Sequence, residues 1–515
     1  MTRLIANYLG IAGLCVGAAI CHGQVTRNQV VHSIKTFDAV PVSTAKSVVP
    51  GSVFEAGVRF TNFSDLNRTP NGQSWYVVAS TDFAASTAQD QGLLRGTGLG
   101  TAILAREGVT ETAPGEFLNF SLVPAVRMNN AGQWAVAYRQ NVTGSTSLND
   151  RLVKFLDSTL QTVLAPGSAI PGGGGNTFNA SGGNTSNLSF NSVNVSAAGD
   201  LGFMAYQAGA ATPNDTGFKD KGATIVADPT SGQFVPAGQL NAGSFAVTDI
   251  APNTFQLNEA HTSYILQGTL NGAAAAIVDG LVRVQIGAPV PTVASGNVTN
   301  IDVVRMESSG DWFVVGRILS GATTLRFVMR NGAIIAESGQ PIIPGSTELW
   351  GTVTFRDPSG DSAGNWIVNG STTNASTLLN DVLVYNSAKV VARESDPLDL
   401  DGNGVYDDGL FLHTFRNRGV LASDDFFYWS TTLKATAAGT AGIGASPNNG
   451  ALVRIRVCKV DFDNSGATTV GDIFAFLTAW FASDRRADFD LSGDRNVTDI
   501  FAYLTEWFAA ASNGC

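Results

Sequence analysis

The sequence predicts an all-β body, folded as a seven-bladed β-propeller, followed by a small all-α module that binds calcium. For the body, a turn-and-strand pattern recurs seven times between about residues 24 and 457. For the module, two acidic loops, each followed by an apolar helix, repeat within residues 458–515. A β-solenoid and a pair of β-sandwiches are the alternative architectures for the body.

Residues 1–23 have the features of a secretory signal peptide. Arg3 supplies a positive charge, and Leu9–Ile20 is an apolar run too short to span a bilayer comfortably. Cleavage after Gly23 would release the protein, and lipidation at Cys21 is the alternative. Because no later segment is long and apolar enough for a transmembrane helix, we expect a secreted protein, extracellular or attached to a cell surface.

Composition narrows the class of protein further. The chain has 515 residues, 44% of them hydrophobic and only 14% charged, with 57 glycines. This mixture is typical of a secreted β-rich protein with many turns, and its hydrophobicity is too high for a disordered chain. The formal net charge of −11 argues against a nucleic-acid partner, because phosphate recognition needs clustered Lys and Arg.

Each repeat of the body has a glycine-containing turn followed by a strand rich in aromatic and β-branched residues, as in Asn129-Asn-Ala-Gly132-Gln-Trp134. The copies begin at Asn71, Asn129, Ser196, Asn258, Glu307, Asp361 and Asn417. Most copies precede a second hairpin, as in 326–336 and 382–391, and the Asn331-Gly332 pair of the first favours a tight turn. Seven such units predict seven blades.

The Asn-x-x-Gly-x-x-x-aromatic pattern resembles the Asn-x-x-Gly-x-x-x-Phe tandem-repeat family of bacterial secreted proteins, which carry various C-terminal anchors. The resemblance covers most of residues 46–457 and implies no particular activity. We interpret the glycines as strand-linking turns. We interpret the tryptophans of the body as blade core rather than as platforms for sugars.

Two segments of the tail match each other 27 residues apart and have the ligand spacing of a calcium loop. Such a loop offers oxygens at positions 1, 3, 5, 7, 9 and 12, with glycine at position 6. The first loop offers Asp461, Asp463, Ser465, the Ala467 carbonyl, Thr469 and Asp472. The second loop offers Asp488, Asp490, Ser492, the Asp494 carbonyl, Asn496 and Asp499. A pair of acidic turns that only cap helices is the alternative.

These paired loops resemble the dockerin family, in which Asp stands at position 12 and a single helix follows each loop. The ending Asn513-Gly514-Cys515 is similar to that of a group of secreted bacterial proteins whose dockerins end in Gly-Cys. The resemblance implies Ca²⁺ as cofactor and a protein partner, either a cohesin-like domain or another cell-envelope component. Serine at position 5 departs from the family and removes one carboxylate, which lowers the expected affinity.

The helix after each loop carries one apolar stripe. The stripes are Ile473, Phe474, Leu477, Trp480 and Phe481 in the first helix, and Ile500, Phe501, Leu504, Trp507 and Phe508 in the second. Phe476 and Tyr503 fall outside these stripes, so we expect these two side chains to contact the partner. The alternative is that all the aromatic residues of the helices form the small core of the module.

Cys458 and Cys515 bracket the tail. Export favours a disulfide between them, which would stabilise the module by roughly 4 kcal/mol, and a free terminal thiol is the alternative.

A third acidic segment lies between the sixth and seventh repeats. It resembles the short calcium loops of integrin-type propellers, with ligands Asp399, Asp401, Asn403, the Val405 carbonyl and Asp407. An acidic surface turn is the alternative.

The sequence contains no convincing catalytic constellation. Gly360-Asp-Ser362-Ala-Gly364 has the form of a nucleophile elbow, but it lies in a repeat turn and no helix follows it. The histidines after the signal peptide, His32, His261 and His413, lack the spacing of metal ligands. We therefore expect a non-catalytic binding protein that its tail attaches to a partner and whose propeller is free to bind a ligand such as a glycan. A dockerin-bearing polysaccharide-degrading enzyme, either a glycoside hydrolase or a lyase, is the alternative. A structural envelope protein is a third.

Overall fold

The computed structural model describes the body and most of the tail. The described residues are 30–35, 54–120 except 55–56, 84–86, 88 and 98–99, 126–140, 149–171, 175–178, 188–207, 215–228, 233–234, 247–290 except 252 and 271, 296–399, 408–440 except 425, 450–463, 468–484, and 487–513 except 488 and 490–494. The expected signal peptide lies outside these residues.

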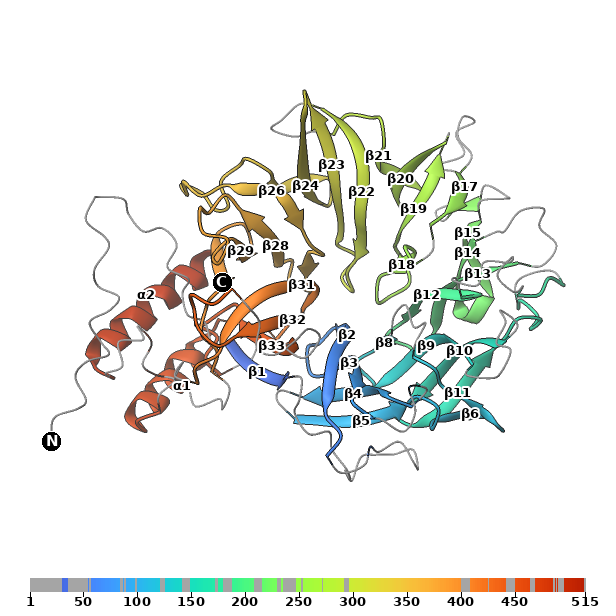
Figure 1. Ribbon diagram of the computed structural model, residues 1–515, viewed down its shortest axis with the longest axis horizontal. Coiled ribbons are helices and arrows are strands. Elements are labelled where there is room, and N and C mark those ends of the chain that lie inside the picture. The colour runs from blue at the N-terminus through green and yellow to red at the C-terminus, as the bar shows by residue number, and fades with distance from the viewer. Residues whose placement is uncertain are drawn as a thin grey trace.

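Seven antiparallel sheets stand around a central axis, so the body is an all-β, seven-bladed propeller (Figure 1). Blade one holds β2 (Phe60–Arg68), β3 (Trp75–Thr81), β4 (Gln91–Thr97) and β5 (Gly100–Arg106). Blade two holds β8 (Val126–Met128), β9 (Gln133–Arg139), β10 (Asp150–Leu156) and β11 (Thr159–Leu164). Blade three holds β12 (Phe190–Val195), β13 (Leu201–Tyr206), β14 (Asp215–Lys219), β15 (Thr224–Asp228) and β16 (Gln233–Phe234). Blade four holds β17 (Val247–Ile250), β18 (Gln256–Leu257), β19 (Tyr264–Leu270), β20 (Ala273–Val278) and β21 (Leu281–Gln285).

The remaining blades complete the ring. Blade five holds β22 (Asn297–Met306), β23 (Trp312–Ser320), β24 (Thr323–Arg330) and β25 (Ala333–Glu337). Blade six holds β26 (Trp350–Phe355), β27 (Ser359–Gly360), β28 (Trp366–Thr372), β29 (Asp381–Tyr385) and β30 (Lys389–Arg393). Blade seven holds β31 (Phe411–Leu421), β32 (Phe426–Lys434), β33 (Gly450–Arg456) and β1 (Val30–Lys35). Outside the blades, β6 (Glu111–Ala113) pairs with β7 (Glu116–Phe117).

Blade seven joins the two ends of the body. Its outermost strand β1 comes from the start of the described chain and pairs antiparallel with β33, which ends the body. A blade that combines strands from both ends holds the ring closed by hydrogen bonds between the two ends of the body. Sequence reasoning did not assign this closing strand.

Six repeat turns share one hydrogen-bond pattern between the first two strands of a blade. In blade two, Gly132 N donates to Asn129 O at 3.1 Å, and Asn129 N donates to Gln133 O at 3.0 Å. The glycine has a φ of +79°, in the left-handed region that side chains disfavour. In blade four His261 occupies the equivalent position with a φ of +53°. The repeat glycine is therefore a backbone requirement of the turn.

The seventh repeat was predicted in the wrong register. Gly419 lies inside β31, where it pairs with Trp429, instead of at a turn. The turn of blade seven comes later, near Ser423 and Asp424, between β31 and β32. It lacks the glycine that marks five of the other six copies, so the nearest Asn-x-Gly was mistaken for it.

The cores of the blades are aromatic and continuous between neighbours. Trp134 stacks on Phe155 with ring centroids 4.4 Å apart, and Trp429 stacks on Phe427 at 5.6 Å. Five of the six tryptophans in the body are buried: Trp75, Trp134, Trp312, Trp350 and Trp429. The sixth, Trp366, is half-buried beneath the Arg330 guanidinium. Their assignment to the blade core is confirmed.

The tail follows β33 directly and contains two helices, α1 (Val470–Phe481) and α2 (Val497–Asn513). Both helices lie beside blades six and seven, at the left of Figure 1. Among the described residues, neither helix is long and apolar enough to cross a membrane.

Candidate functional sites

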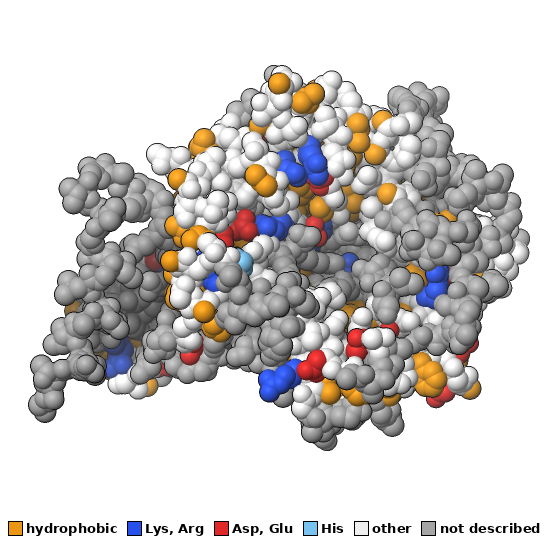
Figure 2. All heavy atoms as spheres, viewed as in Figure 1, with side chains coloured by type: hydrophobic (Ala, Val, Ile, Leu, Met, Phe, Trp, Pro, Cys, Tyr) orange, Lys and Arg blue, Asp and Glu red, His pale blue; other side chains and the backbone are white. Residues whose placement is uncertain are grey.

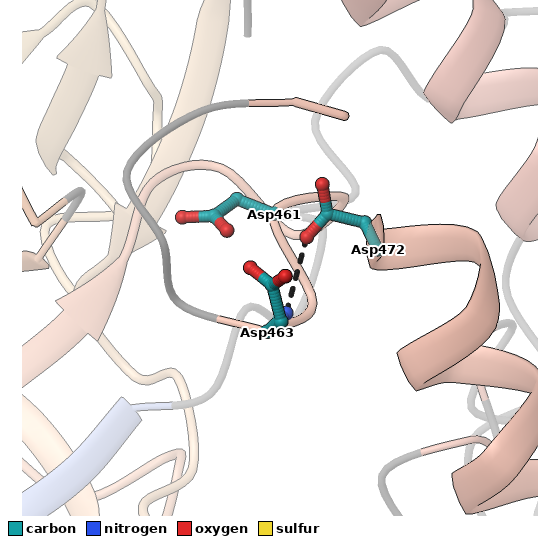
Figure 3. A group of neighbouring side chains, drawn as sticks. All are labelled: Asp461, Asp463 and Asp472. Atoms are coloured by element: carbon teal, nitrogen blue, oxygen red, sulfur yellow. Dashed lines mark hydrogen bonds between the residues drawn. The ribbon is translucent and has the colours of Figure 1, made fainter. Parts of the chain in front are cut away.

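Three carboxylates of the first tail loop converge in front of α1. Asp461, Asp463 and Asp472 each place one oxygen within 4.8 Å of the others (Figure 3). Asp461 and Asp472 are fully buried, whereas Asp463 is exposed. These residues are positions 1, 3 and 12 of the predicted loop, so the fold brings together the first and last of its carboxylates.

Asp472 also caps α1. Thr469 N donates to Asp472 Oδ2 at 2.7 Å, and Gly471 N donates to Thr469 Oγ1 at 3.1 Å. These bonds form a capping box, which satisfies amides at the helix start. The second loop repeats the first half of this arrangement, because Asn496 N donates to Asp499 Oδ2 at 2.8 Å.

The two halves of the tail exchange hydrogen bonds. Trp480 Nε1 on α1 donates to Asn496 O of the second loop at 3.2 Å. Trp507 Nε1 on α2 donates to Thr469 O of the first loop at 3.0 Å. Since both members of each bond are 27 residues from their counterparts, the contacts are related by a local twofold. Each loop is therefore held by the helix of the other half.

Phe476 and Tyr503 form the centre of the tail core. Their rings stack 4.1 Å apart at an angle of 1°, and both side chains are fully buried. Phe462 and Phe489 close the stack edge-on, with centroids 5.4 Å from Phe476 and 5.3 Å from Tyr503 respectively. The prediction that Phe476 and Tyr503 face a partner is therefore wrong. An amphipathic helix with apolar residues on most sides does not reveal which side it buries.

Other aromatic side chains of the tail face solvent. Phe474 and Phe481 on α1, and their counterparts Phe501 and Phe508 on α2, are between 62% and 76% exposed. In each helix the two phenylalanines are seven residues apart, which places them on one face. Four exposed phenylalanines in so small a module exceed what scattered surface apolar residues explain.

Several predicted ligands lie outside the described residues: Ser465, Ala467, Asp488, Asp490, Ser492, Asp494, Asp401, Asn403, Val405 and Asp407. Of the third acidic segment the structure describes Asp399, whose side chain is buried. Cys458 is buried in the tail core, and Cys515 lies outside the described residues. The second loop, the third site and the disulfide therefore remain predictions.

A central channel runs between the innermost strands of the blades. Hydrogen bonds of 2.9–3.2 Å link each blade to the next around one mouth of this channel. The links are Asn71 N to Asn130 Oδ1, Asn129 Nδ2 to Ser196 O, Ala197 N to Glu259 O, Glu259 N to Ser308 O, Gly360 N to Glu307 Oε1, Leu421 N to Ser359 Oγ, and Ser423 Oγ to Pro70 O. The repeat turns thus form a closed circuit of hydrogen bonds around this mouth.

Buried charges reinforce the circuit. Arg68 of blade one pairs with Asp424 of blade seven at the seam of the ring. Arg305 of blade five pairs with Glu307 at 2.7 Å and donates to Gly419 O of blade seven at 3.3 Å. Burial raises the pKa of Glu259, which belongs to the circuit.

Two cavities lie along the channel. The first, of about 100 Å³, lies beneath the repeat turns and is lined by residues from all seven blades. The second, of about 250 Å³, lies nearer the other mouth and is lined by blades two to six. Sequence reasoning missed both, because they are assembled from short segments of blades that are far apart in the chain.

One face of the ring carries interspersed charges. In Figure 2, basic and acidic side chains lie side by side over β22–β24 and again over β28 and β29. Among these strands Asp302 pairs with Arg317 at 2.7 Å and with Arg326 at 3.1 Å. The charges on this face are therefore largely compensated rather than gathered into a patch of one sign.

No protein-family model and no curated protein matches the chain. Among solved structures, the β-propeller domain of Cps50 (Swd1) from Myceliophthora thermophila is 9% identical, with a TM-score of 0.30 over 71% of this chain and 96% of that one. The GH74 enzyme of Niastella koreensis is 10% identical, with a TM-score of 0.36 over 80% of this chain and 55% of that one. The extracellular domains 1–2 of Drosophila Semaphorin 1b are 9% identical, with a TM-score of 0.34 over 84% and 90%. At these scores the similarities carry no functional inference, and the propeller assignment follows from the order and pairing of the strands.

Proposed function

We propose that this chain is a secreted, non-catalytic binding protein whose dockerin-like tail attaches it to a protein of the cell envelope when calcium is bound. The signal-peptide features of residues 1–23 support export. The convergence of Asp461, Asp463 and Asp472 is the single observation that carries the calcium step. The cofactor is thus Ca²⁺, and the partner is a cohesin-like domain or another envelope component.

The carboxylate geometry favours a hard divalent cation. Calcium is bound by several oxygens, and the buried Asp461 and Asp472 offer two of them at the start and end of one loop. Asp463, on the exposed side, would supply a third. Since Asp472 also caps α1, calcium bound here would fix the start of that helix.

The exposed phenylalanines supply the docking surface. Phe474 and Phe481 share one face of α1, and Phe501 and Phe508 share the equivalent face of α2. Interfaces are enriched in aromatic anchors, which contribute most of the binding energy when a partner desolvates them. Because each helix begins at a calcium loop, loss of calcium would loosen both faces together.

A direct test uses the full-length protein as bait for proteins of the envelope fraction, with calcium and then with a chelator. We expect one partner to be captured only when calcium is present. The Phe474→Ala and Phe501→Ala variants should lose this capture, whereas the Asp484→Asn control should keep it. Calorimetric titration of the unliganded protein should show calcium binding that Asp463→Asn weakens about tenfold or more. Calcium-independent capture, or calcium binding unchanged in Asp463→Asn, would contradict the proposal.

Binding is favoured over polysaccharide hydrolysis by the state of the aspartates in the larger cavity. Glycoside hydrolysis ordinarily needs two carboxyl groups flanking the scissile bond. Of the two described aspartates that line the larger cavity, Asp302 is held by Arg317 and Arg326, which leaves Asp357 alone. An activity screen on polysaccharides should therefore show no turnover.

A Cys458–Cys515 bridge would close the tail on itself. Cys458 is buried among the tail aromatics, next to the first loop. Alkylation followed by mass spectrometry, with and without a reductant, distinguishes this bridge from a free terminal thiol.

The third calcium loop is tested by replacement of Asp399 and Asp407 by Asn. If this loop binds calcium, the variant should bind one calcium ion fewer than the wild type.

A further inference from the structure

The larger channel cavity has the position and size of a binding site for a small molecule. It is lined from blades two to six and offers about 250 Å³. This is below the roughly 300–1,000 Å³ of sites that enclose drug-sized ligands, so it suits a single ring.

A strained serine points to a ligand in this cavity. Ser192 lies within β12, the innermost strand of blade three, with a φ of +52° at a break in the strand register. Its side chain is 7% exposed, and among the described residues its hydroxyl has no hydrogen-bond partner. Both features are costly: left-handed backbone at a non-glycine residue, and a buried polar group without a partner. Because Ser192 lines the cavity, rotation of its side chain would bring the hydroxyl to a ligand hydroxyl that satisfies the second.

Further polar groups around Ser192 are also available. Gln267 of β19 and Asp357 before β27 line the same cavity, and the structure describes no hydrogen bond from either side chain. Gln256, in contrast, is committed to blade five: its Nε2 donates to Val304 O at 3.1 Å, and its Oε1 accepts from Met306 N at 3.0 Å. The lining of the cavity thus combines a fixed frame with a serine, a glutamine and an aspartate whose polar groups are available to a ligand.

The charges of the lining select an uncharged ligand. Arg305 is paired with Glu307, and Asp302 is paired with two arginines outside the cavity. The remaining ionic groups of the lining, Arg127 and Asp357, are one of each sign. An anionic or cationic ligand would therefore gain little electrostatic attraction. Ligand hydroxyl groups, in contrast, can donate hydrogen bonds to a carboxylate and can both donate to and accept from an amide and a serine. Phe255 adds an apolar surface for a ring.

We propose that this cavity binds one uncharged, hydroxyl-rich ring, such as a single neutral sugar residue at the end of a glycan. The proposal deepens the binding function by giving the propeller a ligand class and a site, and it does not depend on the tail.

The test uses the full-length protein and ligand-observed NMR with a panel of methyl glycosides. Neutral hexosides should bind, whereas the uronate and amino-sugar counterparts should bind about tenfold more weakly or not at all. Ser192→Gly removes the hydroxyl and permits the positive φ without strain, so the variant should fold at least as well as the wild type and bind about fivefold more weakly. Asp357→Asn should weaken binding by about tenfold.

Controls separate the cavity from the tail. Asp157→Asn, an exposed carboxylate on blade two, should leave sugar binding unchanged, and so should Phe474→Ala. Conversely, Ser192→Gly and Asp357→Asn should leave capture of the envelope partner unchanged. The proposal is overturned if no neutral glycoside binds, if charged glycosides bind better, or if both cavity variants bind like the wild type.

Discussion

Replacement of Phe476 by Ala should unfold the tail and leave the propeller intact. Phe476 is fully buried and stacks on Tyr503 at 4.1 Å, with Phe462 and Phe489 edge-on to the stacked pair. Truncation of a buried Phe costs about 3–5 kcal/mol. A module of this size has a total stability of only about 3–9 kcal/mol, at roughly 0.05–0.15 kcal/mol per residue.

Hydrogen exchange followed by mass spectrometry reports on the tail peptides separately from the propeller. A loss of 3 kcal/mol should speed exchange of the most protected amides in α1 and α2 by about 100-fold or more, because every 1.4 kcal/mol is tenfold. The matched control is Phe474→Ala, two residues away on the same helix but 66% exposed. Its cost should stay within about 0.5 kcal/mol, so exchange changes by about twofold.

The two variants should therefore separate stability from docking. Phe476→Ala destabilises the tail, and Phe474→Ala weakens partner capture while the tail stays folded. Equal exchange in the two variants, or a cost below about 1 kcal/mol for Phe476→Ala, would refute the assignment of Phe476 to the tail core.

Three further predictions concern the ring. Gly199→Ala should cost about 1–3 kcal/mol in urea unfolding, because its φ of +85° lies in a region that side chains disfavour. Burial, which outweighs the nearby Asp200 and Asp220, lowers the pKa of His261 to about 4, so the folded protein loses stability as the pH falls from 6.5 to 4. His261→Asn, which tolerates the same positive φ, should reduce the drop in Tm between pH 7 and pH 5, and an equal drop would contradict this origin. Deletion of residues 24–35 removes β1 and exposes the edge of β33, so the Tm should fall and light scattering should show association of the protein. An unchanged Tm without association would show that β1 does not secure the ring.

The sequence was sufficient for the features that depend on local geometry. The repeat turns could be recognised because Gly132 and its equivalents have a positive φ, which favours glycine at the same position of the repeat. The acidic loop could be recognised because Asp461 and Asp472 have a spacing that follows from how a chain wraps around oxygen ligands. The hairpin at Asn331-Gly332 was likewise predicted correctly between β24 and β25.

Features that depend on distant contacts could not be predicted. Pairing of β1 with β33 joins segments about 420 residues apart, and the sequence of neither strand indicates its partner. The lining of the larger cavity combines short segments from five blades that are far apart in the sequence, so no local pattern marks Ser192 or Asp357. The sequence analysis assigned the wrong buried face to the helices because the periodicity of apolar residues identifies the most continuous apolar face. The core instead contains Phe476 and Tyr503, which stack on each other across the local twofold.

The position of β33 determines how the molecule would bear a mechanical load. If the tail is held and the propeller is pulled away, the force enters the body through β33, which leads directly into the first tail loop. This strand has β32 on one side and β1 on the other, so both ladders would have to slide in shear rather than open one bond at a time. The pairing of β33 with β1 that closes the ring would therefore also make the tether resistant to flow and to detachment under tension.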